Sequence, residues 1–209
     1  NDFTVAQVRE FADYLRKVDP YDHPIAFHTH VMKASGDYPD YEAVLGDPRI
    51  EMTSMQCNPQ DAHNHVEKWR AKSAAAGRKW VADIDEITPA GTGLTDTNAI
   101  ELRKKTLYPV YFSGGNIEWY LGYHALPLGG DMRLEDFSTR QEMWIYMRFA
   151  RRFMETYVPF WQMQPADSLV TGEDPAYGGA QVLAKAGEVY AVYYPNTSST
   201  GTIDLTGAN

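Results

Sequence analysis

The sequence predicts an α/β protein whose parallel sheet is followed by a short all-β segment. Apolar runs at 25–30, 50–57, 80–86 and 108–113 each end in polar residues, and segments with helical spacing separate them. Strands that alternate with helices across short loops indicate repeated βα units. We therefore expect residues 1–158 to form the second half of a (β/α)8 barrel, with helices outside. A flavodoxin-like open sheet is the structural alternative.

The helices are predicted from apolar periodicity and from capping residues. Thr4 and Gln7 form a candidate capping box ahead of a helix that Pro20 ends. Further helices are expected at 41–45, from Pro59 to Gly77, at 99–107 and after Ser138. In the last of these, the residues predicted to face inward are Met143, Met147, Ala150, Met154 and Tyr157.

The pattern changes after Pro159, where residues 159–209 are expected to begin a β-sandwich domain. Residues 181–186 and 188–194 alternate as a hairpin turned at Ala186-Gly187, and 201–205 form another strand. Three strands are too few to complete a sandwich. The chain also begins directly at a helix, so we expect it to be an internal fragment of a longer protein.

Composition excludes several classes of function. The net charge of −9 disfavours nucleic acid as a partner, and no apolar run is long enough to span a membrane. The single Cys57 fits neither a disulfide nor a thiolate metal site. The 5 Trp, 14 Tyr and 8 Phe fit carbohydrate binding, but aromatic-rich cores give similar counts.

The stretch WVADIDEITPA, Trp80 to Ala90, is the centre of the functional hypothesis. An apolar run ends in Asp85 and Glu86, and Thr88-Pro89 stops regular structure. In a barrel of parallel strands, active sites lie at this C-terminal edge. Hydrolysis of a glycosidic bond with retention needs two carboxyl groups about 5–5.5 Å apart. Glu86 is the candidate nucleophile, and Asp85 is expected to point to the other side of the strand, for packing or a loop hydrogen bond.

Four runs together resemble one bacterial family. They are DPYDHPIAFHTH from Asp19, DIDEITPA from Asp83, SGGNIEWYLGY from Ser113 and AKAGEVYAVYYP from Ala184. They are similar to the apiosidase-like (β/α)8 glycoside hydrolases, whose C-terminal β-sandwich carries the label of a collagen-binding domain. The resemblance covers nearly the whole chain in order.

The resemblance implies an assignment of barrel strands and catalytic groups. The strand that ends in Glu86 would be strand 7, which carries the nucleophile in the similar clan of retaining glycosidases. The acid/base glutamate would follow strand 4, immediately upstream of Asn1. It also implies a carbohydrate substrate of plant, algal or microbial origin, no cofactor or metal, and a secreted, periplasmic or cell-surface location. A companion chain or a preceding segment would complete the barrel.

Other polar and aromatic residues at the strand ends are candidates for binding substrate. His28 and His30 are expected to share a face and to bind sugar hydroxyls or orient the carboxylates, with backbone-bonded histidines as the alternative. Gln56 follows the next strand, with Asn58 as a weaker neighbour. Trp119 is a candidate floor of the sugar site, or else a core residue, and Glu118 and Tyr123 are weaker candidates.

Two rival functions remain open. The spacing His28-x-His30, repeated at His63-x-His65, is that of a metal-dependent hydrolase. That class also needs an Asp after its last strand, which Ser113-Gly114-Gly115 does not supply, and histidines two residues apart diverge on a helix. The other rival is a non-catalytic protein that binds carbohydrate or extracellular matrix.

Overall fold

The computed structural model describes residues 3–87, 99–118, 141–171, 179–195 and 201–207. Within these ranges the protein is mixed α/β, with a four-stranded parallel sheet and smaller antiparallel sheets. The parallel sheet has the order β1-β2-β3-β4. Its strands are β1 (Ala26–His28), β2 (Met52–Cys57), β3 (Asp83–Ile87) and β4 (Asn116–Ile117). The α/β architecture predicted from the sequence is therefore confirmed.

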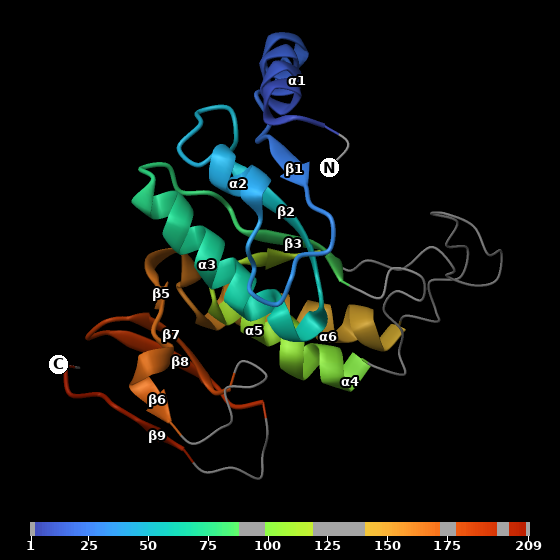
Figure 1. The fold of residues 1–209 in the computed structure, drawn as a ribbon. Helices are drawn as coiled ribbons and strands as arrows, with labels where there is room; N and C mark the ends of the chain where they lie inside the picture. Colours follow the sequence, from blue (N-terminus) through green and yellow to red (C-terminus); the bar gives the residue numbers. More distant parts are fainter. Residues whose placement is uncertain (1–2, 88–98, 119–140, 172–178, 196–200, 208–209) are drawn as a thin grey trace.

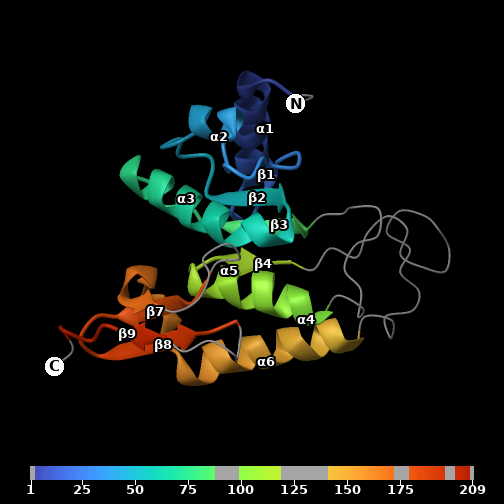
Figure 2. The ribbon, with the colours of Figure 1, turned by 60° about the horizontal axis from the view of Figure 1, so that its bottom comes forward.

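Helix α1 precedes the parallel sheet, and the other helices follow its strands, as βα units require. They are α1 (Val5–Val18), α2 (Pro39–Ala43), α3 (Ala62–Ala75), α4 (Ala99–Leu102), α5 (Tyr108–Phe112) and α6 (Gln141–Tyr157). A 3-10 turn, η1 (Pro59–Asp61), leads into α3, and a π-helical turn, η3 (Arg103–Leu107), joins α4 to α5. Figure 2 shows α5 and α6 side by side along the sheet.

The predicted strand at 108–113 is wrong, because this segment is α5. Its residues favour strands, but propensity is a weak prior that packing overrides. Pro109 has no N–H to donate, and the preceding π-helical turn accommodates it, with the Tyr108 amide donating to the Arg103 carbonyl. The strand instead comes later, at β4, which pairs with β3 through Asp83↔Asn116 and Ile84↔Ile117.

One face of the parallel sheet packs against the helices, and the other is polar. On the first face, Phe27 packs edge-on against Tyr41 of α2, and Tyr41 in turn contacts Trp69 of α3 and Trp80. Alternation places His28 on the opposite face together with its register partner Ser54.

A β-bulge interrupts the alternation in β3. Met55 of β2 pairs with Ile84, but the next residue, Gln56, pairs with Glu86. Asp85 is therefore an extra residue in β3, and such a residue reorients the side chains that follow it. As a result Asp85 and Glu86 both contact His28. The expectation that Asp85 points away from Glu86 is wrong for this reason.

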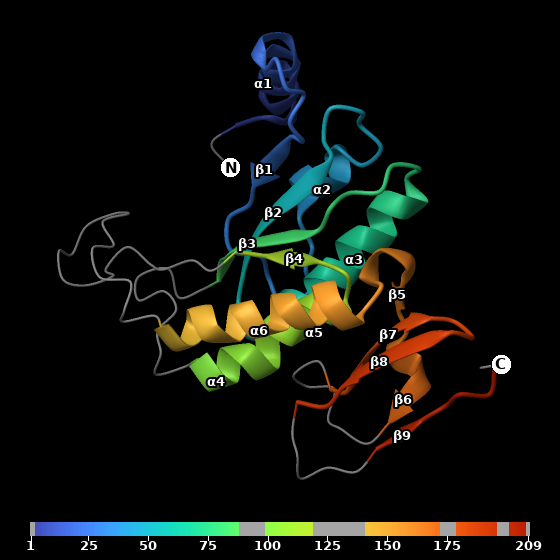
Figure 3. The ribbon, with the colours of Figure 1, turned by 180° about the vertical axis from the view of Figure 1, so that it is seen from behind.

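Helix α1 lies at one end of the molecule, beyond β1 and far from the antiparallel strands (Figures 1 and 3). The predicted capping box is confirmed, since the Thr4 hydroxyl accepts from the Gln7 amide and the Gln7 side chain accepts from the Thr4 amide. The apolar side of α1 is not covered by the described residues: Phe11, Leu15 and Val18 are each about half exposed, at 48%, 47% and 50%.

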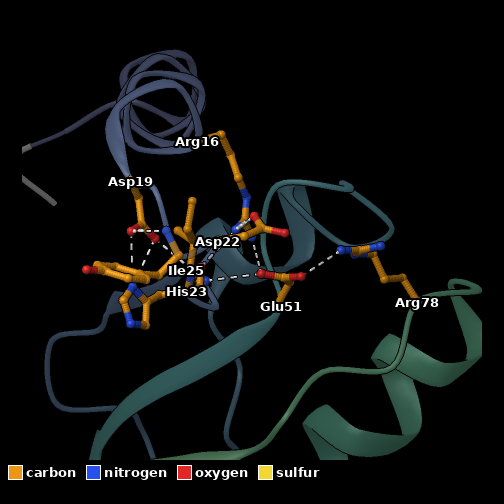
Figure 4. A network of polar contacts seen from close by, with 8 residues as sticks. Arg16, Asp19, Asp22, His23, Ile25, Glu51 and Arg78 are labelled. Atoms are coloured by element: carbon orange, nitrogen blue, oxygen red, sulfur yellow. Dashed lines mark hydrogen bonds and ion pairs between the residues drawn. The ribbon is translucent and has the colours of Figure 1, made fainter.

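Polar contacts fix α1 to the N-terminal edge of the sheet (Figure 4). Arg16 of α1 pairs with Glu51, just before β2, and with Asp22. Glu51 also accepts from the Ile25 amide and from Arg78. These contacts hold the helix in place from its C-terminal end, so that its exposed apolar side stays in a defined position.

The C-terminal part contains two antiparallel sheets. One has the order β5-β7-β8, formed by Gln164–Pro165, Gln181–Lys185 and Val189–Tyr193. The other pairs β6 (Val170–Thr171) with β9 (Thr202–Ile203). The predicted hairpin is confirmed, with Gly187 at a φ of 81° in its turn.

The C-terminal part packs directly on the α/β part. Tyr193 of β8 stacks on Tyr108, and its ring centroid lies 5.7 Å from that of Phe112. These residues belong to a second hydrophobic cluster that also includes Met154 of α6. Met143, Ala150 and Met154 of α6 are buried as predicted, whereas Tyr157 is 68% exposed, so its predicted inward orientation is wrong.

Candidate functional site

The candidate site lies at the C-terminal ends of three neighbouring parallel strands. β1 ends at His28, β2 carries Gln56 next to its end, and β3 carries Asp85 and Glu86. Because the strands are parallel and in register, their C-terminal ends share one edge of the sheet. The structure therefore brings together His28, Gln56 and Glu86, three of the residues that the sequence pattern proposed.

Glu86 is held by two neighbours. Its Oε1 accepts a hydrogen bond from Gln56 Nε2 at 2.5 Å, and its Oε2 lies 3.4 Å from His28 Nε2. The side chain is only 10% exposed. Burial raises the pKa of Glu86, while the nearby His28 and the hydrogen bonds from His28 and Gln56 act in the opposite direction.

His28 bridges the two carboxylates. Its Nδ1 lies 3.0 Å from Asp85 Oδ2, and its Nε2 faces Glu86. The hydrogen bond with Asp85 raises the pKa of His28, since the acceptor favours the protonated ring. In return, that hydrogen bond lowers the pKa of Asp85, and Ser54, whose Oγ donates to Asp85 Oδ2 at 2.5 Å, adds to the effect.

A second group of carboxylates lies on the same face. Oxygens of Asp83, Asp85 and Glu118 lie within 4.8 Å of one another. Asp83 is 2% exposed, and burial, together with the charges of Glu118 and Asp85, raises its pKa to about 7. Partial desolvation and the charge of Asp85 also raise the pKa of Glu118. This face can therefore hold a carboxylic acid in its neutral form near neutral pH.

The remaining predicted residues have different positions. His30 is exposed beyond the end of β1, and its backbone amide donates to the Tyr38 hydroxyl at 3.2 Å. Asn58 precedes η1, where its side chain donates to Asp61. Glu118 directly follows β4 and joins the carboxylate group described above. Trp119 and Tyr123 lie outside the described residues.

Sequence reasoning missed Ser54 and Asp83, and it misplaced Asp85. Strand alternation from Gln56 could have indicated Ser54, which lies two residues earlier on the same strand. Nothing in the sequence signals the bulge that turns Asp85 and Glu86 toward the same histidine.

The metal-hydrolase rival is not favoured by this geometry. His28 is occupied by Asp85 and Glu86, and within the described ranges neither His28 nor His30 belongs to a group of residues that could hold a metal ion. His63 and His65 also diverge: His63 contacts Asp167, whereas His65 lies against Gly36.

A pocket of about 500 Å³ lies away from the candidate site. It is at the opposite, N-terminal edge of β3 and β4, between Val81, Asn116 and residues of α6 and the C-terminal part, including Trp161. The carboxylates, rather than this pocket, define the candidate site, because they carry groups that can do chemistry. Within the described residues no helix is long and apolar enough to cross a membrane.

Comparisons with protein-family models, with curated proteins and with solved structures found no match to this chain.

Proposed function

We propose that this chain carries the nucleophile half of a retaining glycoside hydrolase, with Glu86 as the nucleophile. The observation that supports this most is the convergence of Glu86, Gln56 and His28 at the C-terminal edge of three adjacent parallel strands. A carboxylate fixed on a strand end and held by two donors is positioned more precisely than one on a loop.

In the proposed reaction, a Glu86 carboxylate oxygen attacks the anomeric carbon of a sugar. The glycosidic bond breaks, and its oxygen takes a proton from an acid/base carboxyl group, leaving a covalent glycosyl-enzyme. Water, deprotonated by the same acid/base group, then releases the sugar. The hydrogen bond from Gln56 holds Glu86 ionised and oriented between the two steps.

His28 has a positioning role in this proposal. Paired with Asp85, it presents a positive edge to Glu86 at 3.4 Å. That charge offsets the desolvation of Glu86, which would otherwise favour the protonated, unreactive acid. Asp85 and Ser54 therefore act on the nucleophile through His28.

The half-barrel is also part of the proposal. Parallel sheets are normally covered on both faces, yet the described residues cover one face of this sheet with helices and leave the other polar. The outer edge of β1 pairs with no described strand, and the apolar side of α1 beside it is half exposed. A preceding half-barrel or a companion chain would cover all three surfaces, and would supply the acid/base glutamate.

The substrate class follows the resemblance described above. We propose a polysaccharide or oligosaccharide of plant, algal or microbial origin, handled outside the cell or at its surface. The start of the β-sandwich after Pro159 would be an accessory domain in such an enzyme, and the (β/α)8 barrel would be the catalytic one.

The decisive test is covalent trapping of Glu86 in a preparation that contains the completing half-barrel. A panel of 2-deoxy-2-fluoroglycosides should inactivate the enzyme, and mass spectrometry should find the sugar on the peptide that contains Glu86. Glu86→Ala should lower turnover of activated glycosides by at least about 10³-fold, with azide restoring formation of a glycosyl azide of inverted configuration. Glu155→Gln, at an exposed ion pair of α6, is the matched control.

Two results would contradict the proposal. A label on another carboxylate would assign the nucleophile elsewhere. Carbohydrate binding without turnover, at equal strength in the parent and in Glu86→Ala, would favour the non-catalytic binding protein.

A further inference from the structure

A second cluster of ionisable groups lies far from the strand ends, where α3 meets the C-terminal part. His63 and Glu67 are one helical turn apart on α3, and Asp167 comes from the 3-10 turn η6 (Asp167–Leu169). His63 Nε2 lies 3.0 Å from Asp167 Oδ2 and 3.7 Å from Glu67 Oε2. The histidine side chain is only 6% exposed, whereas the side chains of Glu67 and Asp167 are 38% and 27% exposed, so the cluster is buried on its histidine side and open on its carboxylate side.

The other ring nitrogen fixes the tautomer. His63 Nδ1 lies 3.0 Å from the Pro109 carbonyl oxygen of α5, which can only accept a hydrogen bond. Nδ1 therefore carries a proton, and a neutral His63 presents the lone pair of Nε2 to the two carboxylates. Metal-binding histidines commonly have this arrangement, with the second nitrogen donating to a backbone carbonyl.

A bare lone pair facing two carboxylates is repelled by them, so Nε2 must carry either a proton or a metal ion. Zinc binds His nitrogen and carboxylate oxygen at about 2.0–2.2 Å, so two ligands of a tetrahedral ion are about 3.4 Å apart. The observed separations of 3.0 and 3.7 Å bracket this value, and one ligand atom from each of the three residues lies within 4.8 Å of the others. The three side chains can therefore bind one ion without large movement.

The second oxygen of Asp167 is also fixed. Its Oδ1 accepts from the Val182 amide of β7 at 2.7 Å, which orients Oδ2 toward His63. Glu67 reaches the surface, since it lines a groove of about 490 Å³ with Arg70, Trp80 and Pro165. Of the three side chains, only Glu67 lines this groove, so the groove gives ions and water access to the cluster from the Glu67 side.

We propose that His63, Glu67 and Asp167 bind one divalent transition-metal ion of the zinc class, with water as a further ligand. The ion would tie α3 of the α/β part to η6 and β7 of the C-terminal part, through ligands on both sides. The inference does not depend on the proposed glycosidase activity. A metal that binds only the folded form stabilises that form.

The same contacts have one competing explanation, an ion pair with a doubly protonated His63. Burial lowers the pKa of His63, but Asp167, the Pro109 carbonyl and Glu67 outweigh it and raise the pKa. The groups that face His63 are Glu67 on its own helix, Asp167 of η6 and the Pro109 carbonyl of α5. Zinc and a proton would compete for Nε2, so the two explanations predict opposite results.

The test is titration of the EDTA-treated, dialysed 209-residue chain with ZnCl₂ at about pH 7.5 by calorimetry. We expect one site with a dissociation constant in the micromolar range or tighter, and release of about one proton or less. Co²⁺ should bind the same site and give the visible absorption bands of a tetrahedral ion. Glu67→Gln and Asp167→Asn, at partly exposed positions, should each weaken zinc binding at least about tenfold, and His63→Gln should abolish it.

The matched control is His23→Gln, which removes an exposed histidine that also pairs with a carboxylate four residues away, Asp19. This variant should bind zinc as the parent does. No binding below about 1 mM would overturn the proposal, as would equal binding by the parent and Asp167→Asn. A His63 ring that NMR shows doubly protonated at pH 7.5 in the presence of excess zinc would also overturn it, in favour of the ion pair.

Discussion

The two faces of the parallel sheet are built from the same strands but from different chemistry. On the face under the helices, Tyr41, Trp69 and Trp80 contact one another, and Trp69 and Tyr41 are fully buried. On the other face, His28, Ser54 and Asp85 form a hydrogen-bonded row across three strands. The first face therefore stabilises the fold by burying apolar surface, and the second concentrates ionisable groups whose pKa values are shifted.

This difference indicates that stability depends mainly on the aromatic face and that function depends mainly on the polar face. Buried aromatic rings contribute through area and packing, so they tolerate little truncation. Partly exposed carboxylates and imidazoles contribute less to stability, because solvent screens their interactions. Changes to the aromatic face should therefore destabilise the protein strongly, whereas changes to the partly exposed groups of the polar face should mainly alter pKa values and activity.

The largest expected effect is that of Trp69→Ala on the aromatic face. Removing this fully buried ring leaves a cavity next to Tyr41 and Trp80 and should lower the free energy of unfolding by about 3–5 kcal/mol. Chemical denaturation followed by circular dichroism measures it. Trp161→Ala, at a ring that is 67% exposed, should change stability by less than about 0.5 kcal/mol. Equal losses of unfolding free energy in the two variants would contradict this expectation.

The next effect is a pH dependence from Asp83, the one carboxylate of the polar face that is 2% exposed. Its pKa is about 7 in the folded protein and about 3.9 in the unfolded chain. The folded form therefore binds the proton more tightly, so this stabilisation is complete below about pH 4 and is lost as the pH rises through 7. Between about pH 5 and pH 8 the parent should lose about 2–3 kcal/mol more than Asp83→Asn does. Parallel pH profiles for the two proteins would show that Asp83 titrates normally.

Adjacent residues on β2 give the closest comparison of the two faces. The buried Thr53 hydroxyl accepts from the Asp83 amide at 2.8 Å, so Thr53→Val leaves that amide without a partner and should cost about 1–3 kcal/mol. Ser54→Ala removes a hydrogen bond to the partly exposed Asp85 and should cost less than about 1 kcal/mol. It should instead raise the pKa of Asp85, measurable by carbon NMR of the carboxyl groups. A larger loss of stability from Ser54→Ala than from Thr53→Val would contradict this expectation.

The smallest stability effect is expected at the site itself. Gln56→Leu removes the donor to Glu86 Oε1, so the pKa of Glu86 should rise further while the free energy of unfolding changes by less than about 1 kcal/mol. NMR titration of the carboxyl groups measures the pKa, and chemical denaturation measures the free energy of unfolding. Glu101 of α4 pairs with Lys105 of η3 and has no part in the site. Its pKa should not change, so it serves as the internal control.

The sequence predicted most elements of the fold because their signals are local. The Thr4–Gln7 capping box, the left-handed Gly187 of the hairpin and the apolar periodicity of α6 all depend on residues a few positions apart. The same local signals failed at residues 108–113, where a strand-like composition continues a helix that packs on the core. The candidate Glu86 was also predictable, because carboxylates that follow an apolar run lie at a strand end.

The sequence by itself thus determined the βα order, the helix that begins after Thr4 and the acidic strand end at Glu86. Only the tertiary structure decided that Asp85 joins Glu86 at His28, because a bulge depends on how β3 pairs with β2 rather than on the composition of either strand. It also decided that His63, Glu67 and Asp167 meet, since about a hundred residues separate Asp167 from the other two. Both sites rest on long-range pairing, which no local pattern encodes.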